Sequence, residues 1–383
     1  MNKNTLGLIL VLGLLGFSAC SPQLEHPEDH VSLDFDMVEA GIDWLDLIQS
    51  GAIDEHIRTA FIERIIPTQG CQAIIHHWAR FRKWDAEELY AFIMAALGLM
   101  PSEEPLRKDD GSLTFFGMRR ELWQTALRDT ARMRSDLQTL READLLRSIN
   151  IVRPFLPEAA VLDVRFSFVL FGHSSAFSVG KENGFDFLQL PRKTDGVLDI
   201  EQIIRTFAHE LHHSGFASLD EKYLKDVKNQ DRLMLLGILA AEGMPTYFID
   251  KPQEHLAAYR DSDNHLMQMA AADWEKHTAR LPALYREAEA DILANLEGRL
   301  NQSVIMQQWM AGAKGPAYVL GEDMIRKIDT YLGHDVAVSV AADYRKLLQL
   351  YNRAARRAEA RGEQPHIFSD SLADRTAGFG ATK

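Results

Sequence analysis

The chain has little cysteine, a deficit of basic residues and, beyond its first twenty residues, no apolar run that we expect to span a membrane. It contains 2 Cys in 383 residues, so a framework of several disulfides cannot hold the fold together. Lys and Arg number 42 against 55 Asp and Glu, a formal net charge of −13. This balance argues against nucleic acid as a partner, because its phosphates require a basic surface. With 46% hydrophobic and 25% charged residues, the composition is that of a globular protein with a large core or two lobes.

The N-terminus has the pattern of a secretory signal. An apolar run from Leu6 to Phe17 follows three polar residues and is too short to cross a bilayer. The sequence Phe-Ser-Ala-Cys that ends at Cys20 resembles a bacterial lipobox, although Leu is usual where Phe17 stands. The resemblance implies that Cys20 is lipidated, which leaves Cys71 without a partner, and Ser21 is similar to the residue that directs lipoproteins to the outer membrane. We therefore expect a signal peptide at 1–20 and a lipid-anchored protein of the cell envelope.

The periodicity of apolar residues separates helical from extended segments. Helices are expected at 37–49, 53–65, 71–82, 86–99, 117–149 and over most of 253–300. A charged loop, Pro101–Ser112, lies between two of them. Strands are expected at Val161–Phe171 and Phe185–Leu190, which are rich in β-branched and aromatic residues, with a small-residue loop, Gly172–Gly180, between them. The polar residues 21–33 are expected to be a tether, and the chain after Asn352 is expected to fray.

His209, Glu210 and His213 form the pattern H-E-x-x-H. Residues four apart on a helix lie on the same face, one turn from each other. Two imidazoles at this spacing can bind one Zn²⁺ ion, and the glutamate beside them then projects toward a water on the ion. Apolar residues before the motif would bury the back of the helix, and Gly215 is expected to end it. The alternative is a surface helix whose histidines are merely solvated.

A zinc hydrolase site needs a third protein ligand and one open position. The pattern H-E-x-x-H-x-x-G-x-x-H is excluded, because positions 216 and 219 are Phe and Leu. The other familiar arrangement takes a glutamate from a second helix downstream. In the apolar run Asp231–Pro245, Glu242 is the one acidic residue after Asp231, and a carboxylate in a buried helix is costly unless it is paired or bound to metal. The alternative is that Glu242 reaches solvent at a helix end, since Pro245 is expected to kink or stop the helix.

With His209, Glu210, His213 and Glu242, the last two 29 residues apart (242 − 213 = 29), the chain resembles the gluzincin branch of zinc metallopeptidases. Further segments are similar to bacterial zinc peptidase families of unknown function; these segments are Glu242–Tyr247, Gly315–Met324 and Leu347–Asn352. The resemblance covers about residues 150–352. It implies a zincin-like catalytic region at 151–352 with a small sheet. Together with the helical periodicity of 34–150, this predicts a predominantly α-helical α+β fold with a helical N-terminal region at 34–150 and a tail at 353–383.

One position departs from the gluzincin pattern. Gluzincins of the thermolysin type carry an acidic residue one turn after the ligand glutamate, where this chain has Thr246. The carboxylate that orients a zinc-bound histidine must therefore come from elsewhere, or a backbone carbonyl must replace it.

Peptide hydrolysis assigns further roles. Glu210 would take a proton from the attacking water and pass it to the leaving amine. The resemblance implies that Tyr318, in the segment Pro-x-Tyr-x-x-Gly, donates a hydrogen bond to the oxyanion, with Tyr247 as the second candidate; an ordinary half-buried role is the alternative for either tyrosine. His212 points about 100° away from His213 on the helix, so a solvated side chain is the favoured interpretation and a place near the metal or substrate the alternative.

The resulting prediction is a zinc peptidase of the cell envelope that acts on peptide or protein substrates. Two other classes stay open. One is a catalytically silent envelope lipoprotein that serves as a binding module, although an intact Glu210 would have no use there. The other is a zinc hydrolase of non-peptide amides or esters that uses the same site.

Overall fold

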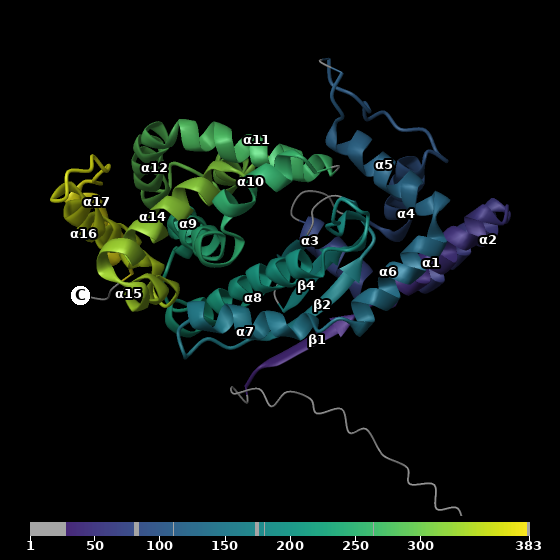
Figure 1. The fold of residues 1–383 in the computed structure, drawn as a ribbon, viewed down its shortest axis with the longest axis horizontal. Coiled ribbons are helices and arrows are strands. Elements are labelled where there is room, and N and C mark those ends of the chain that lie inside the picture. The colour runs from purple at the N-terminus through teal and green to yellow at the C-terminus, as the bar shows by residue number, and fades with distance from the viewer. Residues whose placement is uncertain are drawn as a thin grey trace, which may run out of the picture.

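The computed structural model describes residues 28–79, 84–109, 111–172, 176–179, 181–262 and 264–380. Cys20, the expected signal peptide and most of the expected tether lie outside the described residues. In the described part the fold is mainly helical with one small mixed sheet, which is compatible with the predicted α+β class. Figure 1 shows the N-terminal helices and the sheet toward one end of an elongated molecule and the C-terminal helices toward the other, with α8 running between them.

The sheet has four strands in the order β1-β2-β4-β3. The strands are β1 (His30–Asp34), β2 (Asp163–Val169), β3 (Ala176–Val179) and β4 (Glu182–Asp186). β1 and β4 both run parallel to β2, and β3 pairs antiparallel with β4 at the edge. Two predictions are corrected here. Residues 30–33 are strand rather than tether, and the expected loop 172–180 contains β3.

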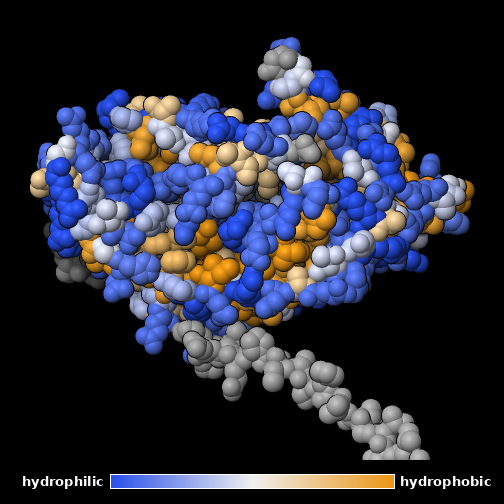
Figure 2. Space-filling view, viewed as in Figure 1, coloured by the Kyte–Doolittle hydropathy of each residue, from blue (hydrophilic) through white to orange (hydrophobic). Residues whose placement is uncertain are grey.

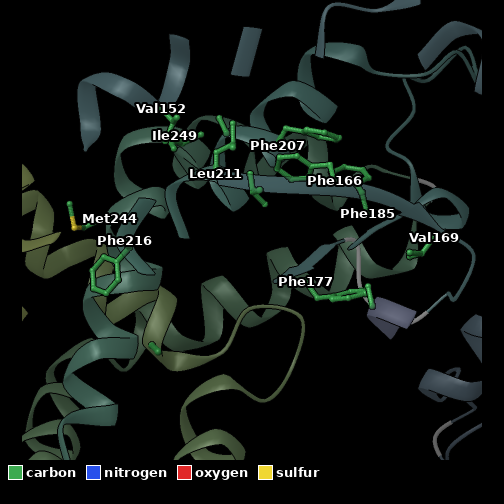
Figure 3. Close-up of a cluster of buried hydrophobic side chains, with 14 of the residues drawn as sticks. Val152, Phe166, Val169, Phe177, Phe185, Phe207, Leu211, Phe216, Met244 and Ile249 are labelled. Carbon is green, nitrogen blue, oxygen red and sulfur yellow. The ribbon is translucent and has the colours of Figure 1, made fainter. Parts of the chain in front are cut away.

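Alternation along β2 explains why the sheet can be covered on both faces. Phe166 and Phe168 are two residues apart, so they point to the same face. Their rings lie 4.3 Å and 5.7 Å, centroid to centroid, from Phe207 of the helix α8 (Ile200–Tyr223), and the ring of Phe185 lies 4.7 Å from Phe207. Figure 3 shows three of these rings, Phe166, Phe185 and Phe207, close together. The sheet also contacts α1 and α3.

The N-terminal helices agree with the predicted segments to within a few residues, apart from the stretch 117–149, which is broken at Asp129 and again after Glu142. They are α1 (Asp36–Gln49), α2 (Asp54–Ala60), α3 (Gln69–Trp78), α4 (Ala86–Leu97), α5 (Phe115–Arg128), α6 (Thr130–Glu142) and α7 (Ser148–Val152). The stretch predicted as one helix over 117–149 divides at Asp129, whose side chain accepts a hydrogen bond from the backbone N–H of Arg132 and so starts a new helix.

The C-terminal half is built from helices that pack on α9 and α14. They are α9 (Met234–Pro245), α10 (Pro252–Arg260), α11 (His265–Ala279), α12 (Leu281–Leu296), α13 (Gln302–Ile305), α14 (Pro316–Leu332), α15 (His334–Val338), α16 (Leu347–Glu359) and α17 (Asp370–Ala377). The prediction that the chain frays after Asn352 is wrong. Phe368 and Leu372 are buried, and the Asn352 side chain both donates to the Phe368 carbonyl and accepts from its N–H.

Two helix ends also differ from prediction. Gly215 does not end α8, which continues to Tyr223. The glycine instead permits close packing, because a Cβ at this position would lie 2.4 Å from a methyl group of Leu156. Pro245 is the last α-helical residue of α9, but it does not end the helical path of the chain. A π-helical segment, η6 (Thr246–Asp250), follows α9 directly. In both places tertiary packing outweighs the local signal.

Helices α9 and α14 approach each other at two glycines. A Cβ on Gly243 would lie 2.4 Å from the carbonyl carbon of Gly321, and one on Gly321 would lie 2.3 Å from the Leu239 oxygen. Gly243 therefore permits the close backbone approach that the sequence indicated. The contact joins the turn that carries Glu242 to the helix that carries Tyr318.

By length and composition alone, the helical segment Gln230–Asp250 is long and apolar enough to cross a membrane. The sequence-based expectation that no segment after the first twenty residues is apolar enough to do so is therefore wrong for this segment. Of its most apolar window, 61% is buried inside the protein. It is the core helix of the C-terminal half, packed against α8, α12 and α14.

Candidate metal centre and cleft

The H-E-x-x-H residues lie in the middle of α8, with Phe207 anchoring the helix on the sheet behind them. The ligand atoms of His209, Glu210 and His213 all lie within 4.8 Å of one another. The two imidazoles stand nearly perpendicular, with ring centroids 4.7 Å apart. The predicted spacing thus brings both rings to one face of the helix.

Glu242 of α9 completes this group. Its Oε2 lies 3.6 Å from Nε2 of His209 and 3.5 Å from Nε2 of His213. The same oxygen is buried and has no hydrogen-bond partner. The alternative, that Glu242 escapes to solvent at a helix end, is wrong, since its side chain is 14% exposed.

These atoms fit a zinc ion. Two imidazole nitrogens and a carboxylate oxygen are a donor set that zinc accepts, and donors about 2.0–2.1 Å from a tetrahedral ion are roughly 3.4 Å apart. The two distances to Glu242 Oε2 are close to that separation. A cation among the three atoms would also satisfy the partnerless Glu242 oxygen, which would otherwise be a costly buried group.

Asp250 places a carboxylate beside His209, although the chain has Thr246 where thermolysin-type gluzincins carry an acidic residue. Its Oδ2 lies 3.1 Å from Nδ1 of His209. Nδ1 donates this bond in the neutral tautomer, which leaves the Nε2 lone pair facing Glu242. Asp250 is eight residues after Glu242, and the wider π turn of η6 brings it back toward the face that Glu242 occupies.

The carboxylates around His209 favour a positive charge at this position. Burial alone would lower the pKa of His209, but the charges of Asp250 and Glu242 outweigh it and raise that pKa to about 10 in the metal-free chain. In the same way, although burial would raise the pKa values of Glu242 and Asp250, the nearby cations hold both well below their usual range. The site attracts a proton or a metal ion.

Glu210 is oriented from the sheet. Its Oε2 accepts a hydrogen bond of 2.8 Å from the hydroxyl of Ser178 on the edge strand β3. The side chain of Asn183, on β4, lies beside the next turn of α8 and donates to Ser214 at 3.2 Å. The edge of the sheet therefore fixes both the rotamer of Glu210 and the position of its helix.

The two candidate tyrosines are in different places. Tyr318 lines the same cleft as His209 and Glu210, and burial together with the charges of Glu242 and Glu210 keeps the pKa of its phenol well above the usual value. Tyr247 instead donates a hydrogen bond of 2.8 Å to Asp329 on α14. The geometry therefore favours Tyr318 over Tyr247 as a group that can reach a substrate.

His212 is fully buried, so the favoured interpretation of a solvated histidine is wrong. Its Nε2 lies 3.2 Å from the carbonyl oxygen of Phe155 and donates to it. Burial is the main reason that the pKa of His212 falls to about 3, with the neighbouring rings of His213 and His209 adding to it. His212 is neutral and fastens α8 to the chain just after α7.

A cleft of about 470 Å³ opens at His209 and Glu210. Its lining comes from α8, from β3 and β4, and from the C-terminal elements α10, α11 and the chain before α14. Phe115 at the start of α5 also lines it, so the N-terminal helices contribute to the cleft. On the face drawn in Figure 2, apolar residues form several patches among predominantly hydrophilic ones.

Comparison with known proteins gives one family. The sequence model of the family described as "Putative zinc dependent peptidase (DUF5700)" matches residues 62–360. Comparisons with curated proteins and with solved structures give no significant match. The matched region includes all the residues of the metal centre and most of the N-terminal helices.

Proposed function

Since the chain belongs to this family of zinc-dependent peptidases, we propose that it is a gluzincin-type peptidase with His209, His213 and Glu242 as zinc ligands. The observation that carries this proposal is the buried Glu242 Oε2, which accepts no hydrogen bond within normal distance and faces both Nε2 atoms at 3.5–3.6 Å, while Glu210 lies beside the same two histidines. A histidine pair alone would be compatible with many roles. Hydrolysis requires a third ligand, here the buried Oε2 of Glu242, and a further carboxylate that is free to act as a base, here Glu210.

The residues around the ligands then have distinct tasks. When bound, zinc supplies a Lewis acid that lowers the pKa of water and polarises a carbonyl. Glu210 accepts the proton of the attacking water and delivers it to the leaving amine, while Ser178 holds its Oε2. Tyr318 donates from its protonated phenol to the oxygen on which negative charge develops. Asp250 keeps His209 in the tautomer that can ligate.

The test uses the chain from Ser21 to Lys383 loaded with zinc, a quenched-fluorescent peptide library and an activated ester. We expect peptide hydrolysis by the wild type and none by Glu210→Gln, with one zinc per chain in both. The variant is isosteric and lacks only the base. Hydrolysis of the ester together with no cleavage of any peptide in the library would support the non-peptide hydrolase instead. A zinc-loaded wild type that hydrolyses neither would support the silent lipoprotein.

We further propose that the protein acts at the cell envelope, held by a lipid on Cys20. The support is the signal-like apolar run and the lipobox-like sequence before Cys20. Cys20→Ser should move the protein from the membrane fraction to the soluble fraction and abolish labelling by a radioactive fatty acid. Membrane association that survives this substitution would contradict lipid anchoring.

A further inference from the structure

Lys314 reaches into the metal centre from the short segment before α14. Its Nζ lies 3.2 Å from Oδ2 of Asp250, the same oxygen that accepts from His209. The ammonium also lies over the ring of Tyr318, 4.4 Å from the centroid. One lysine thus contacts both the partner of a proposed zinc ligand and the proposed oxyanion donor, and it also lines the cleft.

The backbone around Lys314 is held in place. Oδ2 of Asp273, on α11, accepts from the N–H of Ala313 at 2.8 Å and from that of Lys314 at 3.5 Å. The Lys314 side chain is 24% exposed and that of Asp250 17% exposed. Holding a long lysine side chain in one buried conformation costs entropy, which the paired carboxylate and the aromatic ring offset.

The charges of the site explain what this lysine does. Three largely buried carboxylates, Glu210, Glu242 and Asp250, carry a formal charge of −3. A divalent ion with two neutral histidine ligands contributes +2, and the +1 of Lys314 brings the sum over these groups to zero (−3 + 2 + 1 = 0). Asp273 is not included, because its carboxylate is bound by the backbone N–H groups of Ala313 and Lys314. In the metal-free chain, burial would lower the pKa of Lys314, but the charges of Asp250 and Glu242 outweigh it and hold that pKa above its usual value. The 3.2 Å contact with the Asp250 carboxylate is the geometry expected of an ammonium.

We propose that Lys314 is a positioning residue that neutralises the metal-loaded site through Asp250 and fixes the ring of Tyr318. The inference rests on the proposed zinc site. The ammonium of Lys314 would repel a zinc ion in the nearby site, so the site would bind zinc less tightly than one without this lysine. Because Lys314 neutralises part of the carboxylate charge, the bound ion would also keep more of its Lewis acidity. A lysine that only supported the fold would act in the opposite direction, because its loss would loosen the site and weaken zinc binding.

The test compares Lys314→Met, which removes the charge with little change of shape, with Lys314→Arg, which keeps it. Lys225→Met is the matched control, since Lys225 is an exposed residue after α8. Zinc affinity is measured by competition with a chelator, and the melting temperature is measured with and without zinc. We expect Lys314→Met to bind zinc about tenfold more tightly than wild type, and zinc to raise its melting temperature by more. Arg at 314 should resemble wild type in both.

Turnover provides the second readout. Lys314→Met should lower kcat at least about tenfold with little change in KM, and Lys314→Arg should recover most of that loss. Zinc affinity in Lys314→Met that is unchanged or weaker would overturn the charge-balancing role, and an unchanged kcat would overturn the positioning of Tyr318. If wild type hydrolyses no peptide, the proposed function fails, while the zinc measurements still decide the role of Lys314.

Discussion

Asp250 Oδ2 lies 3.1 Å from Nδ1 of His209, at the opposite edge of the imidazole from Glu242. This carboxylate lies beyond Pro245, the last residue of α9, in the π-helical segment η6. In the proposed zinc site, Asp250 would orient His209 in place of the acidic residue that thermolysin-type gluzincins carry at the position of Thr246.

Asp250→Asn should weaken zinc binding by about 10- to 100-fold, because it keeps a hydrogen-bond acceptor near His209 but removes the charge that polarises the ring. Chelator competition measures the change. Asp226→Asn, at an exposed position, is the control and should bind zinc as wild type does. Equal zinc affinity in both variants would mean that Asp250 has no part in orienting His209.

Tyr318→Phe should lower turnover by around two orders of magnitude while leaving zinc content unchanged, because it removes one donor to the developing oxyanion. Tyr247→Phe is the comparison, since its hydroxyl is bonded to Asp329 and it does not line the cleft. Steady-state kinetics on one peptide substrate separate kcat from KM. A full rate in Tyr318→Phe, or a large loss in Tyr247→Phe, would reassign the donor.

Gly243→Ala should destabilise the protein by about 2 kcal/mol or more, because its new methyl group would collide with the backbone of Gly321 and force α9 and α14 apart. Gly237→Ala is a matched control on the same helix. Its Cβ would lie 3.4 Å from the Tyr344 ring, an ordinary contact, and alanine there should be neutral or stabilising by up to about 1 kcal/mol. Urea unfolding compares the two, and equal stability of both variants would contradict the close glycine contact.

Local patterns could predict the helices and the proposed zinc ligands, since H-E-x-x-H needs only one turn of helix and Glu242 is the one acidic residue after Asp231 in an apolar run. Asp250 was not identifiable in this way. Pro245 predicts a kink or stop of the helix, so the sequence does not indicate that Asp250 returns toward the face of Glu242, whereas the helical chain continues into η6, which packs against α14.

Other features depend on contacts between distant parts of the chain. β1 is only five residues long and becomes a strand by pairing with β2, more than a hundred residues away. His212 is buried because Phe155 supplies a carbonyl for its ring. The contacts of Lys314 with Asp250 and Tyr318 have no periodicity in the sequence that could reveal them. Such contacts become visible only when the elements are assembled.

The central claim is that Glu242 is the third zinc ligand. Elemental mass spectrometry of the chain from Ser21 to Lys383 and of its Glu242→Ala variant, both purified after zinc addition, tests it most directly. The account predicts one zinc per wild-type chain and little in the variant, because two histidines alone hold the ion weakly. Equal zinc in both proteins, or none in the wild type, would contradict it.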